Sequence, residues 1–415
     1  MKRTILCIDL KSFYATCECI LLNKDPFTTP LVVANYKQGM GAITLAITPA
    51  LKKLGIKSRT RLFLIPKDIK YEIIMPKMSH YIEMSKKVIS IYLDFVSKDD
   101  LHVYSIDESF LDVTHYLKYY NMTDLELGKY IMDTIYKKTK LYATCGIGEN
   151  MFLAKAAMDN EAKKNKDSIA KWELCNIENT LWKLDLIDMW GIGKNMEKRL
   201  NELKIYNVYE LAHANKDYLI NKLGIIGEEL WLHANGFDDA IISENDYIVK
   251  NTSYANSQIL FKDYSKQEIY LIIYETLEIL TKRLRKNNKM CKRLSLTIGY
   301  SKIINDGFNR HVTLDNYTKN IDELYDNAIM LFNKFYLDSY PIRKVGISLS
   351  IIKSQNEFQT NLFNNSNKLK DKEKISNSID KIDDKYGKNT IVKASALLNN
   401  STIIERGKKI GGHNA

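Results

Sequence analysis

The sequence lacks several features that would set the class of protein at once. No apolar run approaches the roughly 20 residues that a membrane-spanning helix needs, so we expect no membrane partner. The six cysteines are scattered, and no group of cysteine and histidine has the spacing of a zinc site, which favours reduced thiols in a cytoplasmic protein. Only a few apolar residues precede Asp9, too few for the core of a secretory signal, so we expect no export signal.

Acidic residues are outnumbered. The formal net charge is +11 over 415 residues, a length that predicts several domains. A basic balance favours a polyanionic partner, and without a membrane segment nucleic acid is the first choice. An AT-rich genome would also enrich lysine, asparagine and isoleucine, so charge alone does not decide the function.

An adjacent acidic pair, Asp107 and Glu108, is the most informative feature that is present. The apolar residues around it in 102–113 predict two half-buried strands with the pair at or near their turn. Neighbouring carboxylates repel each other, so either one is protonated or a cation holds both ionised. Asp9, near the end of a predicted strand over 4–10, would complete an oxygen-rich site suited to Mg²⁺. The alternative is a solvated acidic turn without a function.

The order of elements around this pair predicts a particular sheet. A strand over 4–10 is followed by a helix over 76–96, the hairpin over 102–113, a helix over 124–140 and a strand over 142–148. This is the order of a split βαβ, ferredoxin-like domain. Such a sheet brings carboxylates from separate strands to one edge.

Two Gly-apolar-Gly turns lie among short helices predicted over 184–237. They run from Trp190 to Lys194 and from Leu223 to Gly227. In a helix-hairpin-helix, the amides of such a turn and a nearby lysine bind a DNA phosphate without contacting bases. Glycine also ends ordinary helices, so a plain C-cap is the alternative for both turns.

Residues 257–353, after a polar linker, predict a separate unit of helix and alternating strands. Between Ile279 and Asn305 it has many basic residues and no acidic one. A solvated basic face usually explains such a run. The remaining residues, 354–415, are rich in asparagine, lysine and serine, and we expect them to be only partly ordered.

Three ordered motifs resemble one known family. Ser-Ile-Asp-Glu-Ser-Phe-Leu-Asp-Val, at 105–113, resembles the Ser-Ile-Asp-Glu-Ala-Phe-Leu-Asp signature of the Y-family DNA polymerases, the translesion enzymes. Ile-Asp-Leu-Lys-Ser-Phe-Tyr-Ala lies upstream at 8–15, and Gly-Ile-Gly-Glu-Asn-Met-Phe-Leu-Ala-Lys lies downstream at 146–155. The resemblance covers nearly the whole chain and is specific because the order and spacing of the motifs match.

This resemblance implies an α+β multidomain fold shaped like a right hand. Its expected parts are a ferredoxin-like palm (1–25 and 71–165), small fingers (26–70), a helix-hairpin-helix thumb (166–242), an α/β little finger (246–353) and a C-terminal tail (354–415). The implied reaction is attack of a primer 3′-hydroxyl on the α-phosphate of a dNTP. The implied setting is translesion synthesis in DNA repair and SOS-type damage tolerance.

The resemblance also assigns roles to residues of the active site. Asp107 and Glu108 are catalytic, and with Asp9 and the backbone carbonyl of Leu10 they hold two Mg²⁺ ions. The residues implied in dNTP binding are Phe13, Tyr14, Lys52 and Lys155. Among these, Tyr14 packs under the sugar and excludes a 2′-hydroxyl, and Lys155 holds the β- and γ-phosphates. From the residues alone, Tyr14 could equally be a core aromatic and Lys155 a solvated charge.

The fingers depart from the commoner family pattern. A Tyr-Glu-Ala-Arg segment that contacts the triphosphate is replaced by Pro49-Ala50-Leu51-Lys52. Lys52 can still neutralise phosphate but lacks the bidentate fork of arginine. This departure favours the UmuC-like branch of the family.

Contacts with DNA and with a sliding clamp complete the expectation. The implied DNA contacts are Gly191, Gly193 and Lys194 in the thumb and Lys282, Arg283, Arg285 and Lys286 in the little finger. Gln359, Leu362 and Phe363 fit the Gln-x-x-Leu-Phe peptide that docks on the bacterial clamp. The sequence does not settle whether an accessory subunit is needed.

Two other functions remain open on the sequence. A nucleotide cyclase also carries acidic pairs on a ferredoxin-like palm, but the glycine turns and the basic C-terminal unit argue against it. A catalytically silent DNA- and clamp-binding scaffold is disfavoured because all three carboxylates are present.

Overall fold

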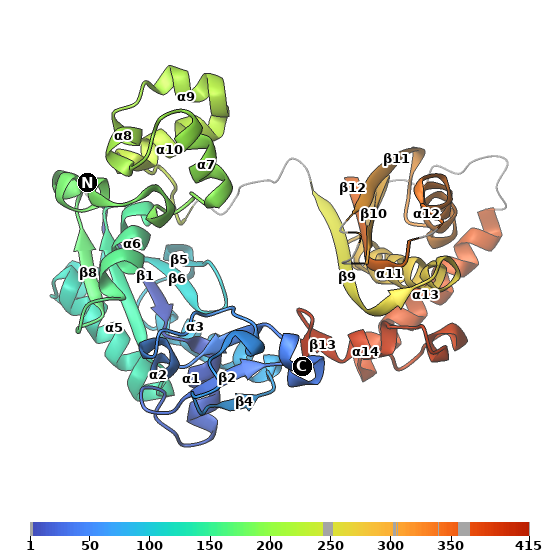
Figure 1. The fold of residues 1–415 in the computed structure, drawn as a ribbon, viewed down its shortest axis with the longest axis horizontal. Helices are drawn as coiled ribbons and strands as arrows, with labels where there is room; N and C mark the ends of the chain where they lie inside the picture. Colours follow the sequence, from blue (N-terminus) through green and yellow to red (C-terminus); the bar gives the residue numbers. More distant parts are fainter. Residues whose placement is uncertain are drawn as a thin grey trace. The chain divides into compact units, whose positions relative to one another are not determined.

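The computed structural model describes residues 3–243, 252–301, 304, 306–338, 340–355 and 366–414. The chain forms two compact units, Met1–Tyr247 with His413–Ala415, and Ile248–Gly412 (Figure 1). Within the described ranges, no helix combines the length and the apolar character needed to cross a bilayer.

A five-stranded sheet organises the first unit. Its strand order is β5-β6-β1-β7-β8. The first four strands pair antiparallel in the order of the predicted ferredoxin-like domain, and β8 adds parallel to β7. Their bounds are Leu101–Val103 (β5), Glu108–Asp112 (β6), Ile5–Leu10 (β1), Ala143–Gly148 (β7) and Ile169–Trp172 (β8).

Helices cover both faces of this sheet. Successive side chains of β7 point to opposite faces and show which helix covers each one. An added Cβ at Gly128 of α5 (Asp124–Thr139) would meet Cys145 and Ile147, so α5 packs on the face formed by these two side chains. An added Cβ at Gly146 would lie 2.1 Å from the carbonyl oxygen of Ala154 in α6 (Met151–Ala157), so α6 lies directly on the other face. Helix α3 (Met78–Leu93) packs beside α5. The short α4 (Tyr116–Tyr120) precedes α5.

A small three-stranded sheet lies between β1 and α3 in the sequence. Its order is β3-β2-β4, with β2 antiparallel to β3 and parallel to β4. The bounds are Leu31–Ala34 (β2), Thr44–Ile47 (β3) and Glu72–Ile74 (β4), with α1 at Phe13–Leu21 and α2 at Pro49–Lys53. Proline at the first position of α2 suits a helix start, because its missing N–H has no intrahelical partner there.

Four short helices form the last part of the first unit. They are α7 (Lys194–Glu202), α8 (Val208–Ala212), α9 (Lys216–Leu223) and α10 (Ile225–Ala234). Their apolar residues share one core with α6 and β8, so this helical part is fixed to the sheet.

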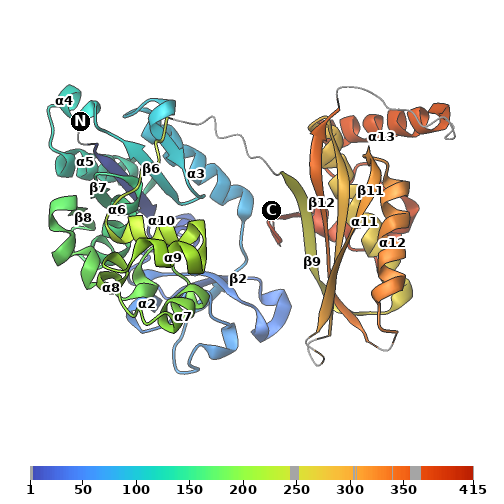
Figure 2. The ribbon, with the colours of Figure 1, turned by 90° about the horizontal axis from the view of Figure 1, so that it is seen from above.

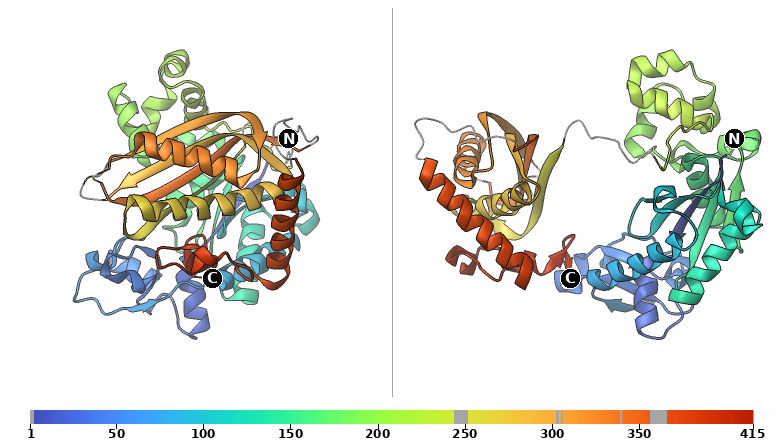
Figure 3. Two further views of the ribbon diagram at one scale, coloured as in Figure 1. Left: turned by 90° about the vertical axis from the view of Figure 1, so that its right-hand side faces the viewer. Right: turned by 180° about the vertical axis from the view of Figure 1, so that it is seen from behind.

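The second unit is built on a four-stranded antiparallel sheet of order β11-β10-β12-β9. Its strands are β9 (Ser253–Tyr264), β10 (Lys289–Tyr300), β11 (Gly307–Thr318) and β12 (Ile342–Ser354). Helices α11 (Lys266–Lys286) and α12 (Ile321–Phe335) lie side by side across one face, as Figures 2 and 3 show. One apolar core joins both helices to the strands.

The segment expected to be a partly ordered tail contributes further elements to this unit. Helix α13 (Ser366–Tyr386) lies on the same side of the sheet as α11 and α12 (Figures 1 and 2), and α14 (Ile403–Gly407) follows. The buried carboxylate of Glu275 on α11 accepts hydrogen bonds from Ser401 and Thr402. The unit therefore extends to Gly412, well past residue 353. Short strands β13 (Lys409–Ile410) and β14 (His413–Asn414) end the chain.

Candidate functional site

The three predicted carboxylates come together on neighbouring strands. Asp9 in β1 faces Glu108 across the β1–β6 ladder. Asp107 lies immediately before β6, and its carbonyl accepts a 2.9 Å hydrogen bond from the backbone N–H of Leu10. The strand arrangement expected from the sequence is therefore confirmed.

Each of these carboxylates has a partner in the protein. Glu108 accepts hydrogen bonds from the Lys155 ammonium at 2.8 and 3.0 Å, and Asp107 accepts one from the Ser105 hydroxyl at 2.7 Å. Asp9 lies 3.7 Å from the Lys163 ammonium. In this arrangement, no three acidic, histidine or cysteine side chains of the described part of the chain are grouped closely enough to enclose a metal ion.

The electrostatics of Asp9 nevertheless fit a divalent cation. Burial raises the pKa of its carboxyl to about 6, Lys163 opposes that shift, and the charges of Asp107 and Glu108 add to it. Carboxylates that repel one another at a partly buried site are suitable ligands for Mg²⁺, because the cation stabilises the carboxylates in their ionised form. Asp9, Asp107, Glu108 and the carbonyl of Leu10 thus suit the predicted metal.

Lys155 lies in a different environment from the one expected. Its side chain is 9% exposed and bridges Glu108 to Asp159, which is 3.0 Å away. Burial would lower the pKa of Lys155, but the hydrogen bond to Glu108 and the charge of Asp159 raise it above its usual value. In this structure, Lys155 therefore holds a catalytic carboxylate. Phosphate binding by Lys155 remains a prediction.

Sequence reasoning missed Lys163, which lies closer to Asp9. After α6 the chain forms a π-helical turn, Met158–Ala162, and Lys163 follows it. Its ammonium group lies 2.7 Å from Asp159 and 3.7 Å from Asp9, and these two charges raise its pKa although burial opposes the shift. The only signal in the sequence was a lysine shortly after the helix.

Two more lysines interact electrostatically with Asp9. Partial burial lowers the pKa of Lys52 on α2, and the charge of Asp9 opposes that shift. The same two influences act on Lys11, which follows β1 and bonds to Ser168. With Lys163, these residues place cationic groups beside the carboxylates, as a site for a polyphosphate requires.

Tyr14 lies at the same site, near the start of α1. It is half-buried, and the burial together with the charge of Asp107 raises the pKa of its hydroxyl. Phe13 is 3% exposed and packs against the rings of Tyr14 and Tyr81. This position makes the Phe13 side chain a support for Tyr14, and its contact with a nucleotide remains a prediction.

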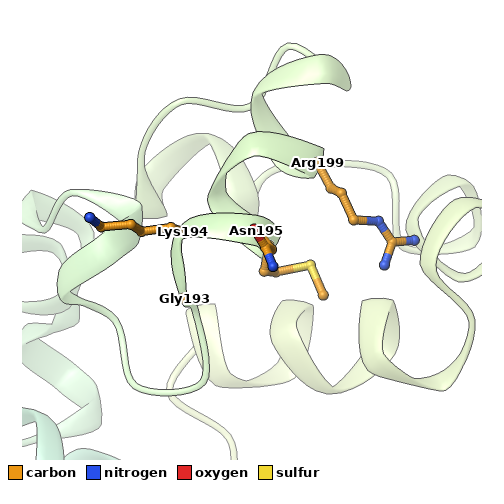
Figure 4. Close-up of a pocket in the computed structure, with 5 residues that line it drawn as sticks. Gly193, Lys194, Asn195 and Arg199 are labelled. Carbon is orange, nitrogen blue, oxygen red and sulfur yellow. The ribbon is translucent and has the colours of Figure 1, made fainter. Parts of the chain in front are cut away.

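The first glycine turn has the predicted shape. Gly191 adopts φ +96°, and Gly193 is the residue before α7. Figure 4 shows Lys194 and Arg199 pointing in different directions around a pocket at this helix start. At the second turn, Gly224 has φ +70° and donates its N–H to Ile220 at 2.8 Å, so it does act as a C-cap.

The basic end of α11 is paired with acidic residues of α13. Arg285 forms two hydrogen bonds with Asp380, at 2.7 and 3.1 Å, and Lys282 bonds Asp383 at 3.0 Å. Other contacts in this region join Lys286 to Asp384 and Arg283 to Tyr254 and the Ala255 carbonyl. DNA contact by Lys282, Arg283, Arg285 and Lys286 remains a prediction, and the pairing with α13 gives Lys282, Arg285 and Lys286 a structural role. The clamp residues Gln359, Leu362 and Phe363 lie outside the described residues.

The opposite face of the same sheet carries small polar side chains. Leu294, Leu296 and Ile298 of β10 are buried under the helices, so the residues between them face the other way. No helix of the described part of this unit covers that face. The outward residues of the two central strands include Arg293, Ser295, Thr297, Lys344, Ser348 and Ser350.

Two of the solved structures that share this fold come from work on Y-family polymerases. A Y-family DNA polymerase chimera, Dbh-Dpo4(243-245)-Dbh, matches with a TM-score of 0.66 and 21% identity, covering 85% of this chain and 99% of that one. A Dbh ternary complex matches with a TM-score of 0.54 and 21% identity over 83% and 98%. The fold is therefore that of a Y-family polymerase.

Sequence comparisons narrow the class to a family. Residues 8–159 match the impB/mucB/samB family, 175–205 the IMS family HHH motif and 251–362 the impB/mucB/samB C-terminal domain. UvrX of Bacillus subtilis (strain 168), named for UV-damage repair, is 37% identical over 99% of this chain and 98% of its own. DNA polymerase IV 2 of the same organism is 32% identical over 99% of both. The chain belongs to the impB/mucB/samB family of bacterial Y-family enzymes and is a DNA-directed DNA polymerase.

Proposed function

We propose that this polymerase extends a primer by two-metal phosphoryl transfer and acts in translesion synthesis as part of SOS-type damage tolerance. The observation that carries the chemistry is the joint placement of Asp9, Asp107 and Glu108 on neighbouring strands, with the raised pKa of Asp9. The similarity to a protein named for UV-damage repair supports the cellular setting.

Separate residues of the chain would bind the metal ions and support the carboxylates that hold them. Asp9, Asp107, Glu108 and the Leu10 carbonyl would hold two Mg²⁺ ions, which when bound activate the primer hydroxyl and stabilise the leaving pyrophosphate. Lys155 holds the carboxylate of Glu108 in place, because the lysine is buried and its ammonium group bonds both carboxylate oxygens.

The neighbouring side chains would bind and select the nucleotide. Lys163, 3.7 Å from Asp9, and Lys52, whose pKa responds to the charge of Asp9, would neutralise the triphosphate of a dNTP. Tyr14 lies beside Asp107 and would exclude a ribose 2′-hydroxyl by its ring.

Primer-template DNA would be bound by both units. The N-terminus of α7 has backbone N–H groups without intrahelical partners, and Lys194 is exposed beside them, which suits a phosphate. On the second unit, the open sheet face combines Arg293 and Lys344 with small hydroxyl residues, so a sugar-phosphate backbone can approach closely. A sliding clamp would recruit the enzyme through Gln359, Leu362 and Phe363.

Primer extension with carboxylate variants tests the chemistry. Asp107→Ala and Glu108→Ala should abolish incorporation in the presence of Mg²⁺ while DNA affinity stays nearly unchanged, because these groups stabilise charge in the transition state. Asp112→Asn is the matched control, since Asp112 is a carboxylate at the other end of β6 that bonds Thr114. Near-parent turnover in either alanine variant would contradict the assignment. A loss in the control as large as theirs would also contradict it.

A further inference from the structure

A buried carboxylate beside the candidate sugar-selecting residue has no part in the chemistry proposed above. Glu18 lies one turn after Tyr14 on α1 and is 0% exposed. Its carboxylate accepts a 2.7 Å hydrogen bond from the Tyr81 hydroxyl and a 2.9 Å bond from the Lys77 ammonium. A buried carboxylate is destabilising unless its oxygens are bonded, so both partners are needed to keep it in the core.

Tyr81 connects this carboxylate to the active site. It is fully buried in the first turn of α3, and its ring stacks on Tyr14 with centroids 4.6 Å apart and planes 21° from parallel. Phe13 contacts both rings, at 5.6 and 6.4 Å. Burial and the bond to Glu18 raise the pKa of Tyr81, so its phenol stays protonated and donates to Glu18.

Fixing the hydroxyl of Tyr81 fixes the position of its long axis, and close packing around the fully buried ring restrains its plane. The charge-assisted bond at one end of the side chain determines where the ring lies, and Tyr14 stacks on that ring. A wall that discriminates a single oxygen atom works only if it cannot tilt away, because small displacements at a reacting site have large effects. Tyr81 lies in α3, Lys77 is the N-cap residue just before it, and Glu18 lies in α1, so the two bonds also join α1 to the start of α3.

We propose that Glu18 and Tyr81 are positioning residues for sugar selection, which hold the Tyr14 ring at the angle that excludes a ribonucleotide. The inference deepens the proposed function and rests on the role of Tyr14 given there. Neither residue touches the nucleotide, since both are buried behind Tyr14 and Phe13.

The test compares nucleotide selectivity in conservative variants of the full chain. For each variant, kcat/KM is measured with a dNTP and the matching rNTP on the same primer-template. Tyr81→Phe keeps the ring and removes the hydroxyl, and we expect it to lower discrimination against the rNTP about fivefold, a smaller loss than in Tyr14→Ala. Glu18→Gln keeps an acceptor for the Tyr81 hydroxyl. Its discrimination against the rNTP should lie between those of the parent and Tyr81→Phe.

A double variant separates positioning from general damage. If Tyr81 acts through Tyr14, then Tyr81→Phe should lower discrimination no further in a Tyr14→Ala background. Tyr92→Phe is the matched control, because it removes a hydroxyl from a buried tyrosine further along α3, and it should keep the parent ratio.

The outcomes distinguish this inference from the function on which it rests. If Tyr14→Ala loses selectivity but Tyr81→Phe keeps the parent ratio, or lowers it equally in both backgrounds, positioning is overturned and the role of Tyr14 stands. If Tyr14→Ala itself keeps the parent ratio, both fail. If Glu18→Gln does not fold, Tyr81→Phe and the double variant still decide the matter.

Discussion

At the scale of single residues, Asp9 shows a conflict between stability and function. Its pKa is about 6 in the folded protein, against 3.8 ordinarily, with burial as the main cause. The folded state therefore binds a proton more readily than the unfolded state between these pH values. The free energy of unfolding should fall as pH rises through this window and stay lower above it. Without metal, ionisation of this carboxylate at neutral pH lowers the free energy of unfolding by about 3 kcal/mol.

Asp9→Asn should therefore stabilise the metal-free enzyme while abolishing incorporation. The amide avoids burying a charge, and Lys163 keeps its bond to Asp159. We expect the free energy of unfolding of the first unit to rise by about 1–3 kcal/mol at neutral pH, and its fall between pH 4 and 6 to flatten. Denaturant unfolding in a chelator measures both. Equal or lower stability than the parent, with Asp112→Asn as control, would show that Asp9 is not strained by burial.

Lys163 and Lys155, which contact the carboxylates directly, should have separable effects. Lys163→Ala should raise KM for the dNTP about tenfold with a smaller change in kcat, because an exposed ammonium beside the site contributes to binding. Lys155→Ala should lower kcat more than it raises KM, because it leaves the buried carboxylate of Glu108 without its cation. Steady-state kinetics at saturating primer-template measures both. The reverse pattern would restore the triphosphate role expected for Lys155.

Motif matching predicted some of these residues and could not predict others. Asp9, Asp107, Glu108 and Tyr14 sit within local strings whose spacing is diagnostic. Lys163 could not be predicted, because the π-helical turn before it changes which side chains of the helix face the site. The bond between Glu18 and Tyr81 joins residues on two helices, and neither sequence nor periodicity links them.

At the scale of elements, α13 changes the meaning of the basic end of α11. The side chains of Arg285 and Asp380 are 12% and 19% exposed, and their two hydrogen bonds are bidentate. The sequence showed the positive residues as one run and Asp380, Asp383 and Asp384 as part of a polar tail. Pairing across about a hundred residues has no local signal, so the sequence indicated a DNA contact or a solvated face for this run but not ion pairs with α13.

Charge reversal tests whether this contact is structural. Arg285→Glu should lower the thermal midpoint of the second unit, because it places a like charge against Asp380 in a partly buried contact. We expect the free energy of unfolding to fall by about 2–4 kcal/mol. Arg285→Asp combined with Asp380→Arg should recover much of that loss. DNA affinity at fixed salt should change little in the swapped protein.

Arg293 supplies the contrast on the open sheet face. Arg293→Ala should weaken DNA binding and reduce the slope of log affinity against log salt by about one, while leaving the thermal midpoint near the parent value. Titration of labelled primer-template at several salt concentrations measures the slope. If Arg285→Ala reduces the slope and Arg293→Ala does not, the DNA contact lies on the α11 side as the sequence first suggested.

At the scale of the whole molecule, the order of elements was predictable and their extent was not. Alternating strands and amphipathic helices predicted the ferredoxin-like order, and the structure has it in β5, β6, β1 and β7. The parallel addition of β8 was missed because 169–172 is short and follows a polar run. Residues beyond 353 join the second compact unit because α13 and the Ser401–Thr402 segment contact α11, and composition does not reveal such contacts.

Recruitment to a sliding clamp is expected to depend on a short peptide outside the catalytic part of the chain. The expected clamp peptide, Gln359 to Phe363, lies between Ser354, where β12 ends, and Ser366, where α13 begins. A short peptide with a Leu-Phe anchor buries little surface, so the expected affinity is micromolar, about −8 kcal/mol. Weak docking still matters, because a clamp raises the effective concentration of polymerase at the primer end.

Leu362→Ala combined with Phe363→Ala should remove stimulation by the clamp and leave synthesis without a clamp unchanged. The measurement is primer extension on a clamp-loaded template beside one without clamp. Leu397→Ala with Leu398→Ala is the matched control, because it also removes two adjacent apolar side chains from the C-terminal region, where both leucines are exposed, at 74% and 56%. If the first double variant is stimulated like the parent, the peptide is not the docking site. If its synthesis falls equally with and without clamp, these residues serve folding or catalysis, and recruitment must depend on another surface of the enzyme.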